Sequence, residues 1–301
     1  MTPAAFITEL KGNSLDDGPG IRSVIFFKGC PLRCAWCHNP ETQSVEVELA
    51  LDSTLCVGSG DCAAACEPKA LAVGRTPVVL HRDRCTECMA CVAVCPSGAL
   101  QAVGKGHSVE ELVERVRSYV PFYQASGGGV TLSGGEPTLP MAFGGALLRA
   151  LKDLGVHTLL ETCGEFPYER FVETMLPHLD EIWFDLKLAD DALHRQYCGT
   201  TNRVIFANFA RLLERFHEGR GPRVLPRIPL VPGITTTADN LRQIADFLRH
   251  NGVTQVALLP YNPLWTEKAG KLGRTPALTA GWMPPQDVQA CRDQFQGFEI
   301  R

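Results

Sequence analysis

The segment SVIFFKGCPLRCAWCHNP (23–40) joins a short apolar run to three closely spaced cysteines, Cys30, Cys34 and Cys37. The apolar run has the length and composition of a buried strand, and the cysteines begin where that strand should end. A cubane iron–sulfur cluster normally takes four thiolates, and no fourth cysteine follows at short spacing. Either a ligand is missing or one iron is left open, and an open metal position can hold a substrate.

The overall composition predicts a cytoplasmic protein with a sizeable core. Of the 301 residues, 45% are hydrophobic and 21% are charged, and the net charge of −4 gives no reason to expect nucleic acid or a membrane as partner. The first residues, MTPAAFITELKG (1–12), lack the pattern of a signal peptide, and no apolar run approaches a membrane span. Ten of the 13 cysteines lie between Cys30 and Cys95, and reduced cysteines clustered in this way indicate metal sites.

Strand-like and helix-like segments alternate after residue 105, which predicts an α/β fold with parallel strands. About six βα units are expected. The first strand is the apolar run before Cys30, and the later strands lie in GGVTLSGG (128–135), HTLLETCG (157–164), EIWFDLK (181–187), RVLPRIPLVPG (223–233) and QVALLPYN (255–262). We predict a partial (βα)6 barrel similar to a TIM barrel, formed by residues 1–44 and 106–301. An open doubly wound sheet is the second choice, because periodicity does not separate the two. The two prolines inside 223–233 predict an irregular or edge strand.

The carboxyl ends of these strands are rich in polar residues and glycine, while the strand interiors are apolar. Ligands bind at the carboxyl ends of the strands in either of these folds. We therefore expect the functional site there, next to the three cysteines.

Residues 45–105 differ in character and are expected to form an insert built on an internal repeat. CVGSGDCAAACEPKAL (56–71) and CTECMACVAVCPSGAL (85–100) align at an offset of 29 positions. The second copy matches the C-x2-C-x2-C-x3-C-P motif of bacterial two-cluster ferredoxins, whereas the first has Ser59 in place of its second cysteine and Glu67 in place of proline. The insert is therefore predicted to be a ferredoxin-like iron–sulfur domain. Zinc is the alternative, but zinc sites rarely duplicate this spacing.

In two-cluster ferredoxins the fourth cysteine of each motif binds the other cluster. One predicted cluster then has a complete set of thiolates, from Cys66, Cys85, Cys88 and Cys91. The other has only Cys56, Cys62 and Cys95, together with Ser59, Asp61, solvent or nothing. A three-iron cluster, an oxygen-ligated cubane and an empty half-site all remain open for it.

The C-x3-C-x2-C group, with Trp36 before its last cysteine, resembles the radical S-adenosylmethionine superfamily. The longer segment DGPGIRSVIFFKGCPLRCAWCHNPET (17–42) resembles the activating enzymes of glycyl-radical enzymes, in the branch with a ferredoxin-like insert. The same resemblance continues in order through SGGEP (133–137), ETCG (161–164), FDLK (184–187), PRIPLVPG (226–233) and LLPYN (258–262).

This resemblance implies a cofactor and an activity. Cys30, Cys34 and Cys37 would hold a 4Fe-4S cluster whose open iron binds S-adenosylmethionine. Reductive cleavage would give a 5′-deoxyadenosyl radical that takes a hydrogen from a glycine Cα of a partner glycyl-radical enzyme. One or two further clusters in the insert would stage electrons from a flavodoxin- or ferredoxin-type donor. We expect an anaerobic, monomeric protein.

The resemblance also implies roles for residues at the strand ends. The stretch Gly134, Gly135 and Glu136 would face the amino group of S-adenosylmethionine, and Trp36 would lie near its adenine. The remaining matches are Glu161, Thr162 and Asp185 for the S-adenosylmethionine and cation site, Lys187 and Arg227 for its methionyl and ribosyl parts, and Asp17 for the partner peptide. Asn262 stands where some members carry histidine.

Simpler interpretations exist for several of these residues. Glu136 would then cap the next helix, Asp185 would be a solvated loop carboxylate, and Trp36 would be core packing. His38 is expected beside the cluster but not as a ligand. The other thiols, Cys163, Cys198 and Cys291, are expected to be buried, with Cys163 facing the site as the alternative.

Two other functions compete with activation of a glycyl-radical enzyme. One is a radical S-adenosylmethionine enzyme that acts on a small molecule, against which the DGPGIR run (17–22) and the two-motif insert weigh. The other is a ferredoxin-like electron carrier without catalysis, against which the separate three-cysteine group weighs.

Overall fold

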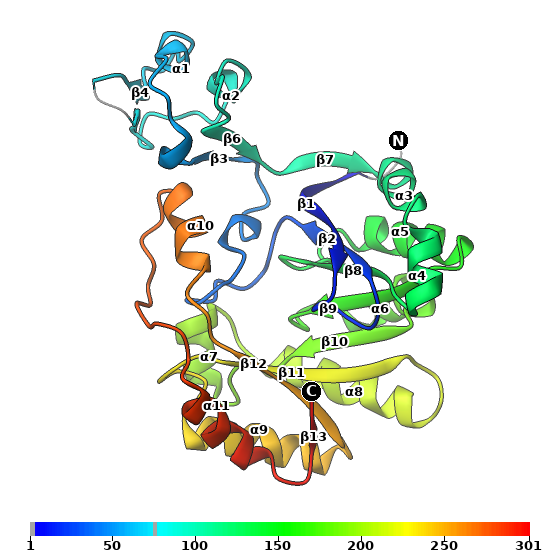
Figure 1. Cartoon of the computed structure of the whole chain (residues 1–301). Helices are drawn as coiled ribbons and strands as arrows, with labels where there is room; N and C mark the ends of the chain where they lie inside the picture. The colour runs from blue at the N-terminus through cyan, green and yellow to red at the C-terminus, as the bar shows by residue number, and fades with distance from the viewer. Residues whose placement is uncertain (1–3, 75–76) are drawn as a thin grey trace.

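A nine-stranded sheet forms the frame of the chain in the computed structural model, which describes residues 4–74 and 77–301 (Figure 1). Its strands are β1 (Ala4–Ser14), β2 (Arg22–Phe27), β7 (Lys105–Ser108), β8 (Gly129–Gly134), β9 (His157–Thr162), β10 (Glu181–Asp185), β11 (Arg223–Leu230), β12 (Gln255–Pro260) and β13 (Glu299–Ile300). The order in space is β13-β12-β11-β10-β9-β8-β2-β1-β7. The strands β2 and β8 to β12 are parallel and confirm the predicted α/β class.

The order of these six parallel strands in space is their order along the chain. A doubly wound sheet reverses its strand order at a switch point, so that alternative is wrong. The connecting helices are α3 (Val109–Arg117), α4 (Val120–Ser126), α5 (Met141–Asp153), α6 (Tyr168–Thr174), α7 (Asp191–Cys198), α8 (Arg203–His217), α9 (Ala238–His250), α10 (Trp265–Lys271) and α11 (Pro285–Arg292). The short 3-10 helices in the described part of the chain are η1 (Pro40–Thr42), η2 (Ser53–Leu55), η3 (Leu176–His178) and η4 (Asp293–Phe295). Among the described helices, none is long and apolar enough to cross a membrane.

Side chains alternate between the two faces of the parallel strands, as strand geometry requires. One face contributes Leu132, Leu160, Ile182, Phe184 and Ile228 to the main core, which also contains buried residues of α3, α5, α8 and α9. The other face carries a separate apolar cluster of Leu159, Trp183, Leu225 and Ala257. Two residues further along the same face come Glu161, Asp185, Arg227 and Leu259. The second face is therefore apolar at mid-height and largely polar at the carboxyl ends.

Two parts of the sheet differ from the sequence-based expectation. The strand β11 is flanked by β10 and β12, so the prediction of an irregular or edge strand was wrong. Each of its prolines withholds only one N–H from the ladder, and the neighbouring residues keep the register. The strand β1 was not predicted; it pairs antiparallel with β2 on one side and β7 on the other.

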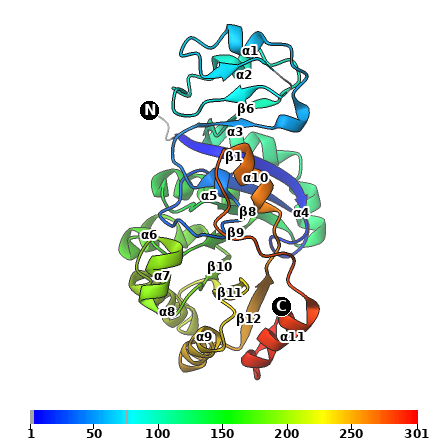
Figure 2. The ribbon, with the colours of Figure 1, turned by 90° about the vertical axis from the view of Figure 1, so that its left-hand side faces the viewer.

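The insert is a small unit with its own core, and it stands above one end of the large sheet (Figures 1 and 2). Its elements are β3 (Glu48–Leu51), α1 (Asp61–Ala64), β4 (Leu71–Ala72), β5 (Val79–Leu80), α2 (Ala90–Ala93) and β6 (Leu100–Val103). The strand β3 pairs with β6, and β4 pairs with β5, both antiparallel. The chain then returns to the large sheet through β7, which begins at Lys105.

Candidate active site

A cavity of about 1060 Å³, partly open to solvent, lies at the carboxyl ends of the parallel strands. It brings together most of the residues singled out in the sequence: Cys30, Cys34, Trp36, Cys37, Gly134, Gly135, Glu161, Thr162, Asp185, Lys187 and Arg227. Of the expected site residues on the large sheet and its loops, Glu136 and Asp17 do not line it.

The loop of three cysteines is held by the segment that follows it. Gly29 has φ +102°, which turns the chain out of β2, and its N–H donates to the Thr42 carbonyl at 2.7 Å. Burial, followed by the charges of Cys34 and Cys30, raises the pKa of the Cys37 thiol to about 12. The three sulfurs therefore lie near one another inside the cavity. Three thiols on one cavity fit a cluster bound by three protein ligands, which leaves room for a further molecule.

Two more thiols flank these cysteines. The Cys163 thiol lies beside that of Cys30, and the Cys198 thiol lies beside that of Cys34. Cys163, Cys198 and Cys291 are all buried, as expected, and Cys163 also lines the cavity. In the described part of the chain, no three His, Cys, Asp or Glu side chains are arranged as ligands of a single metal ion.

A network of charged side chains spans the ends of β9, β10 and β11. Arg227 donates to Glu161 Oε1 at 2.6 Å and to Asp185 Oδ1 at 2.8 Å, and Lys187 donates to Asp185 Oδ2 at 2.8 Å. Ser133 donates to the other oxygen of Glu161 at 2.6 Å. The two carboxylates and two cations compensate one another, and each lies within reach of a ligand in the cavity.

The two carboxyl groups of this network have opposite pKa shifts. Burial raises the pKa of Glu161 above its ordinary value, and the Arg227 guanidinium only partly opposes this. Burial acts on Asp185 too, but Arg227 and Lys187 together outweigh it and hold the pKa of Asp185 below its ordinary value. Asp185 is thus a firmly ionised group and not the solvated loop carboxylate of the simpler interpretation.

The SGGEP segment packs against the cysteine loop instead of simply facing the cavity. A Cβ on Gly134 would lie 2.5 Å from the Phe27 nitrogen, and one on Gly135 would lie 2.1 Å from the Gly29 carbonyl oxygen, so only glycine allows this approach. The side chain of Glu136 is fully buried and turned away from the cavity. Its carboxylate accepts from the hydroxyls of Thr138 and Thr162 at 2.8 and 2.9 Å and from the backbone N–H groups of Thr138 and Cys163. Glu136 therefore ties the β8 loop to the end of β9.

Aromatic side chains form another wall of the cavity. Trp36 is buried against Leu188, Val231, Tyr261 and Trp265 while lining the cavity. His38 also lines it and meets the ring of Tyr261 edge-on, with centroids 6.0 Å apart. Sequence reasoning missed Tyr261, although it lies inside the LLPYN motif. Asn262 does not line the cavity; its side chain accepts from the Leu264 N–H.

Asp17 lies beside the polar network and outside the cavity lining. Its carbonyl accepts from the Thr131 hydroxyl at 2.7 Å, and its carboxylate accepts from Ser14 and lies 3.9 Å from the Lys11 ammonium. The Asp17 charge is close enough to add to the rise in the pKa of Glu161.

The cysteines of the insert gather around two further cavities. One, of about 320 Å³, is lined by Cys66, Cys85, Cys88 and Cys91, and the other, of about 730 Å³, by Cys56, Ser59, Cys62 and Cys95. Besides burial, the nearby charges of Cys95 and Cys56 raise the pKa of Cys62, and those of Cys85, Cys66 and Cys88 raise the pKa of Cys91. Each cavity thus takes one cysteine from the other copy of the repeat.

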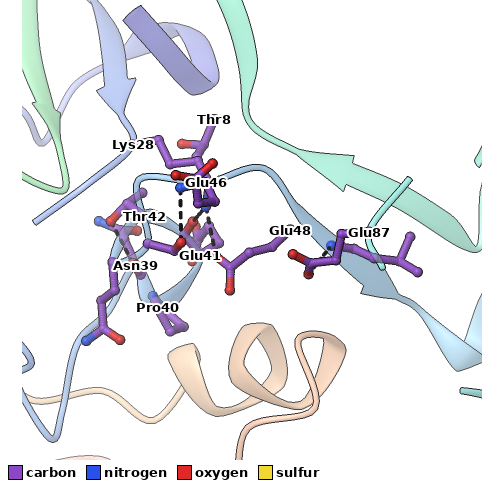
Figure 3. Close-up of polar contacts among 12 residues, drawn as sticks. Thr8, Lys28, Asn39, Pro40, Glu41, Thr42, Glu46, Glu48 and Glu87 are labelled. Atoms are coloured by element: carbon purple, nitrogen blue, oxygen red, sulfur yellow. Dashed lines mark hydrogen bonds and ion pairs between the residues drawn. The ribbon is translucent and has the colours of Figure 1, made fainter. Parts of the chain in front are cut away.

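A buried lysine joins the loop of three cysteines to the insert (Figure 3). Lys28 directly precedes Gly29, and its ammonium donates to the Glu41 carbonyl and to Glu48 Oε2, both at 2.8 Å. Glu48 is the first residue of β3, and Arg274 bonds the same carboxylate. The insert is therefore fixed relative to the three cysteines. Sequence reasoning missed this junction, because it joins charged residues from three separate segments.

The profile described as "Radical SAM superfamily" matches residues 24–248. The chain belongs to the radical SAM superfamily. The isethionate sulfite-lyase activating enzyme of Nitratidesulfovibrio vulgaris is 40% identical over 266 residues, which cover 87% of this chain and 85% of that protein. The choline trimethylamine-lyase activating enzyme of Oleidesulfovibrio alaskensis is 35% identical over 89% of this chain and 87% of that protein. The pyruvate formate-lyase 2-activating enzyme of Escherichia coli is 34% identical over 90% of this chain and 82% of that protein.

These relatives place this radical SAM protein among the activating enzymes of glycyl-radical enzymes. A solved structure of a radical SAM methyltransferase from Sphaerobacter thermophilus superposes on the whole chain and on 77% of its own, with a TM-score of 0.56 and 15% identity. At that identity the likeness supports the fold alone.

Proposed function

We propose that this protein cleaves S-adenosylmethionine to a 5′-deoxyadenosyl radical, which removes a hydrogen from the Cα of one glycine in a partner glycyl-radical enzyme. The observation that carries the proposal is the convergence of three thiols and a compensated charge network on one cavity. Relatives that are named as activating enzymes support the same conclusion.

The residues that line the cavity fit the cofactors of this reaction. A 4Fe-4S cluster on Cys30, Cys34 and Cys37 would supply an open iron for S-adenosylmethionine and the electron that cleaves its sulfonium. Lys187 and Arg227 are cations that suit the methionyl carboxylate, while Glu161, Thr162 and Asp185 suit its amino group, the ribose hydroxyls or a cation. The Gly134–Gly135 backbone and the Trp36 ring supply the walls that orient the molecule.

The partner would present a glycine loop at the open side of the cavity. Glycine has no side chain, so its Cα can approach the reacting atoms closely. The segment around Asp17 is partly exposed and borders the polar network, which suits a contact with that loop.

We propose that the large sheet is a partial (βα)6 barrel and that the insert is a ferredoxin-like domain with one or two iron–sulfur clusters. The strand order supports the first statement, and the pairing of β3 with β6 and of β4 with β5 around two helices supports the second. The insert would stage electrons for the catalytic cluster from a flavodoxin- or ferredoxin-type donor. The protein would act anaerobically in the cytoplasm as a monomer.

Electron paramagnetic resonance tests the activity directly. Reduced protein is mixed without oxygen with S-adenosylmethionine and a panel of glycyl-radical enzymes of the kinds named for the relatives. A glycyl doublet on one panel member is expected, and Cys34→Ala should abolish it while Cys291→Ala, a buried thiol outside the cavity, should not. Release of 5′-deoxyadenosine only with a small molecule would favour a small-molecule enzyme, and no cleavage at all would refute the proposal.

A further inference from the structure

The two halves of the insert share one backbone turn at the position of the second ligand. Ser59 in the first half and Cys88 in the second each precede a residue in the left-handed region, Gly60 with φ 84° and Met89 with φ 63°. That residue is the N-cap of a four-residue helix, α1 or α2, whose second residue is a cysteine. The turn that presents a second ligand is therefore retained in both halves, and only the ligand atom differs.

The cavity beside Ser59 is partly open to solvent, measures about 730 Å³ with that open space included, and is lined by three thiols, those of Cys56, Cys62 and Cys95. The Cys56 sulfur accepts a hydrogen bond from the Val78 N–H at 3.4 Å, as the Cys85 sulfur accepts from the Glu87 N–H at 3.4 Å. Three thiols line one cavity with the Ser59 hydroxyl at the fourth position, and this set of side chains indicates a retained cofactor site.

We infer that this cavity holds a four-iron cluster bound by Cys56, Cys62 and Cys95, with the Ser59 hydroxyl as the weak fourth ligand of an exchangeable iron. The inference rests on the proposed iron–sulfur role of the insert. Thiolate is the ligand that iron–sulfur clusters prefer, and a serine hydroxyl is harder and far less readily deprotonated. The iron beside Ser59 is therefore held more weakly than any iron of the cluster with four thiolates.

The location of the two cavities gives the exchangeable iron a way out. The site with four cysteines lies next to the junction between the insert and the rest of the chain. Glu87, which Figure 3 shows near Glu48, accepts a hydrogen bond from the Leu49 N–H. Arg82 donates to the carbonyls of Leu49 and Lys271. Ser59 and its neighbours Val57 and Gly58 are exposed, as is Cys88 at the matching position of the other cavity, so the two sites differ in the ligand and not in access to solvent. Iron can leave from this side without disturbing the contacts with the sheet.

Mild oxidation with ferricyanide isolates this iron. One electron passes from the doubly charged four-iron cluster to ferricyanide, one ferrous ion leaves, and a singly charged three-iron cluster with all four sulfides remains. The full-length reconstituted protein is assayed for iron released, sulfide retained and the resonance signal of an oxidised three-iron cluster. The open iron of the catalytic cluster adds the same loss in every variant, so the differences between variants carry the result.

We expect wild-type protein to release one more iron per chain than Ser59→Cys, whereas Cys88→Ser, the mirror-image change in the other half, releases one more than wild type. Equal release from wild type and Ser59→Cys would overturn the inference. The inference would also be overturned if wild type and Cys62→Ala contained the same amount of iron per chain before oxidation, because the cavity beside Ser59 would then be empty. If neither Cys88→Ser nor Cys62→Ala changes the iron and sulfide content of the protein, the proposed clusters of the insert are refuted. The glycyl-radical assay tests the activity separately.

Discussion

Replacing Lys28 by methionine is expected to lower the free energy of unfolding by about 3 kcal/mol. The Lys28 side chain is completely buried, and its ammonium makes two bonds of 2.8 Å, to the Glu48 carboxylate and to the Glu41 carbonyl. A charge-assisted bond contributes roughly 1.5–3 kcal/mol, and a buried carbonyl left without its donor costs about 1–3 kcal/mol. The lower part of the summed range applies, because Arg274 still bonds Glu48 and methionine fills the volume of the lysine stem.

Urea unfolding of the cluster-free protein, followed by circular dichroism under reducing conditions, measures this loss. Lys268→Met is the matched control, because Lys268 pairs with Glu41 at 2.8 Å but is 46% exposed, so its loss should cost less than about 1 kcal/mol. A double-mutant cycle with Glu48→Gln isolates the coupling between Lys28 and Glu48. If Lys28→Met destabilises the protein no more than Lys268→Met, the junction with the insert does not depend on this buried pair.

Three further predictions concern other parts of the sheet. Arg227→Met should weaken S-adenosylmethionine binding at least about tenfold by anaerobic calorimetry, while Arg223→Met at the other end of β11 should not; equal affinities would exclude Arg227 from the binding site. In the same urea unfolding experiment, Gly20→Ala should lower the free energy of unfolding by roughly 2–4 kcal/mol, because Gly20 has φ +67° and a Cβ would lie 2.4 Å from the Gly128 nitrogen. The control Gly219→Ala, with φ +69° and open space around the position, should lower it by about 1 kcal/mol, and equal losses would contradict the steric reasoning. Although burial opposes it, the Lys152 ammonium and the Thr158 N–H hold the pKa of Asp180 below its ordinary value of 3.8, so the stabilisation is present above pH 3.8 and is lost as pH falls through the folded pKa. Asp180→Asn should therefore be about 1 kcal/mol less stable than wild type at neutral pH and equal to it in strong acid, and a difference that does not change with pH would refute the reasoning.

The position of the candidate site could be predicted because parallel strands gather their carboxyl ends at one edge. Glu161, Asp185 and Arg227 lie on three different strands, and the same end of each strand brings them into one network. Local sequence patterns were sufficient to predict this meeting of side chains, because hydrophobic periodicity identifies the strands and the motifs identify where the strands end.

Other features depend on contacts that no local pattern reveals. The strand β1 lies between β2 and β7, and β7 comes about 100 residues further along the chain. Glu136 follows two glycines that line the cavity, yet its carboxylate turns inward because four donors from Thr138, Thr162 and Cys163 lie there. The two prolines of β11 do not place it at an edge, because in a parallel ladder the loss of a single donor does not exclude an interior strand.

The ladder of β3 with β6 has an evolutionary consequence. It pairs Glu48 with Val103, so the chain leaves for the insert and returns from it at directly opposed positions, roughly 5 Å apart. A segment with adjacent ends can be gained or lost by a gene while a short turn closes the gap and the strand order of the host sheet stays intact. The insert therefore has the architecture of an accessory unit, and the contacts of Lys28 and Arg274 with Glu48 hold it against the large sheet.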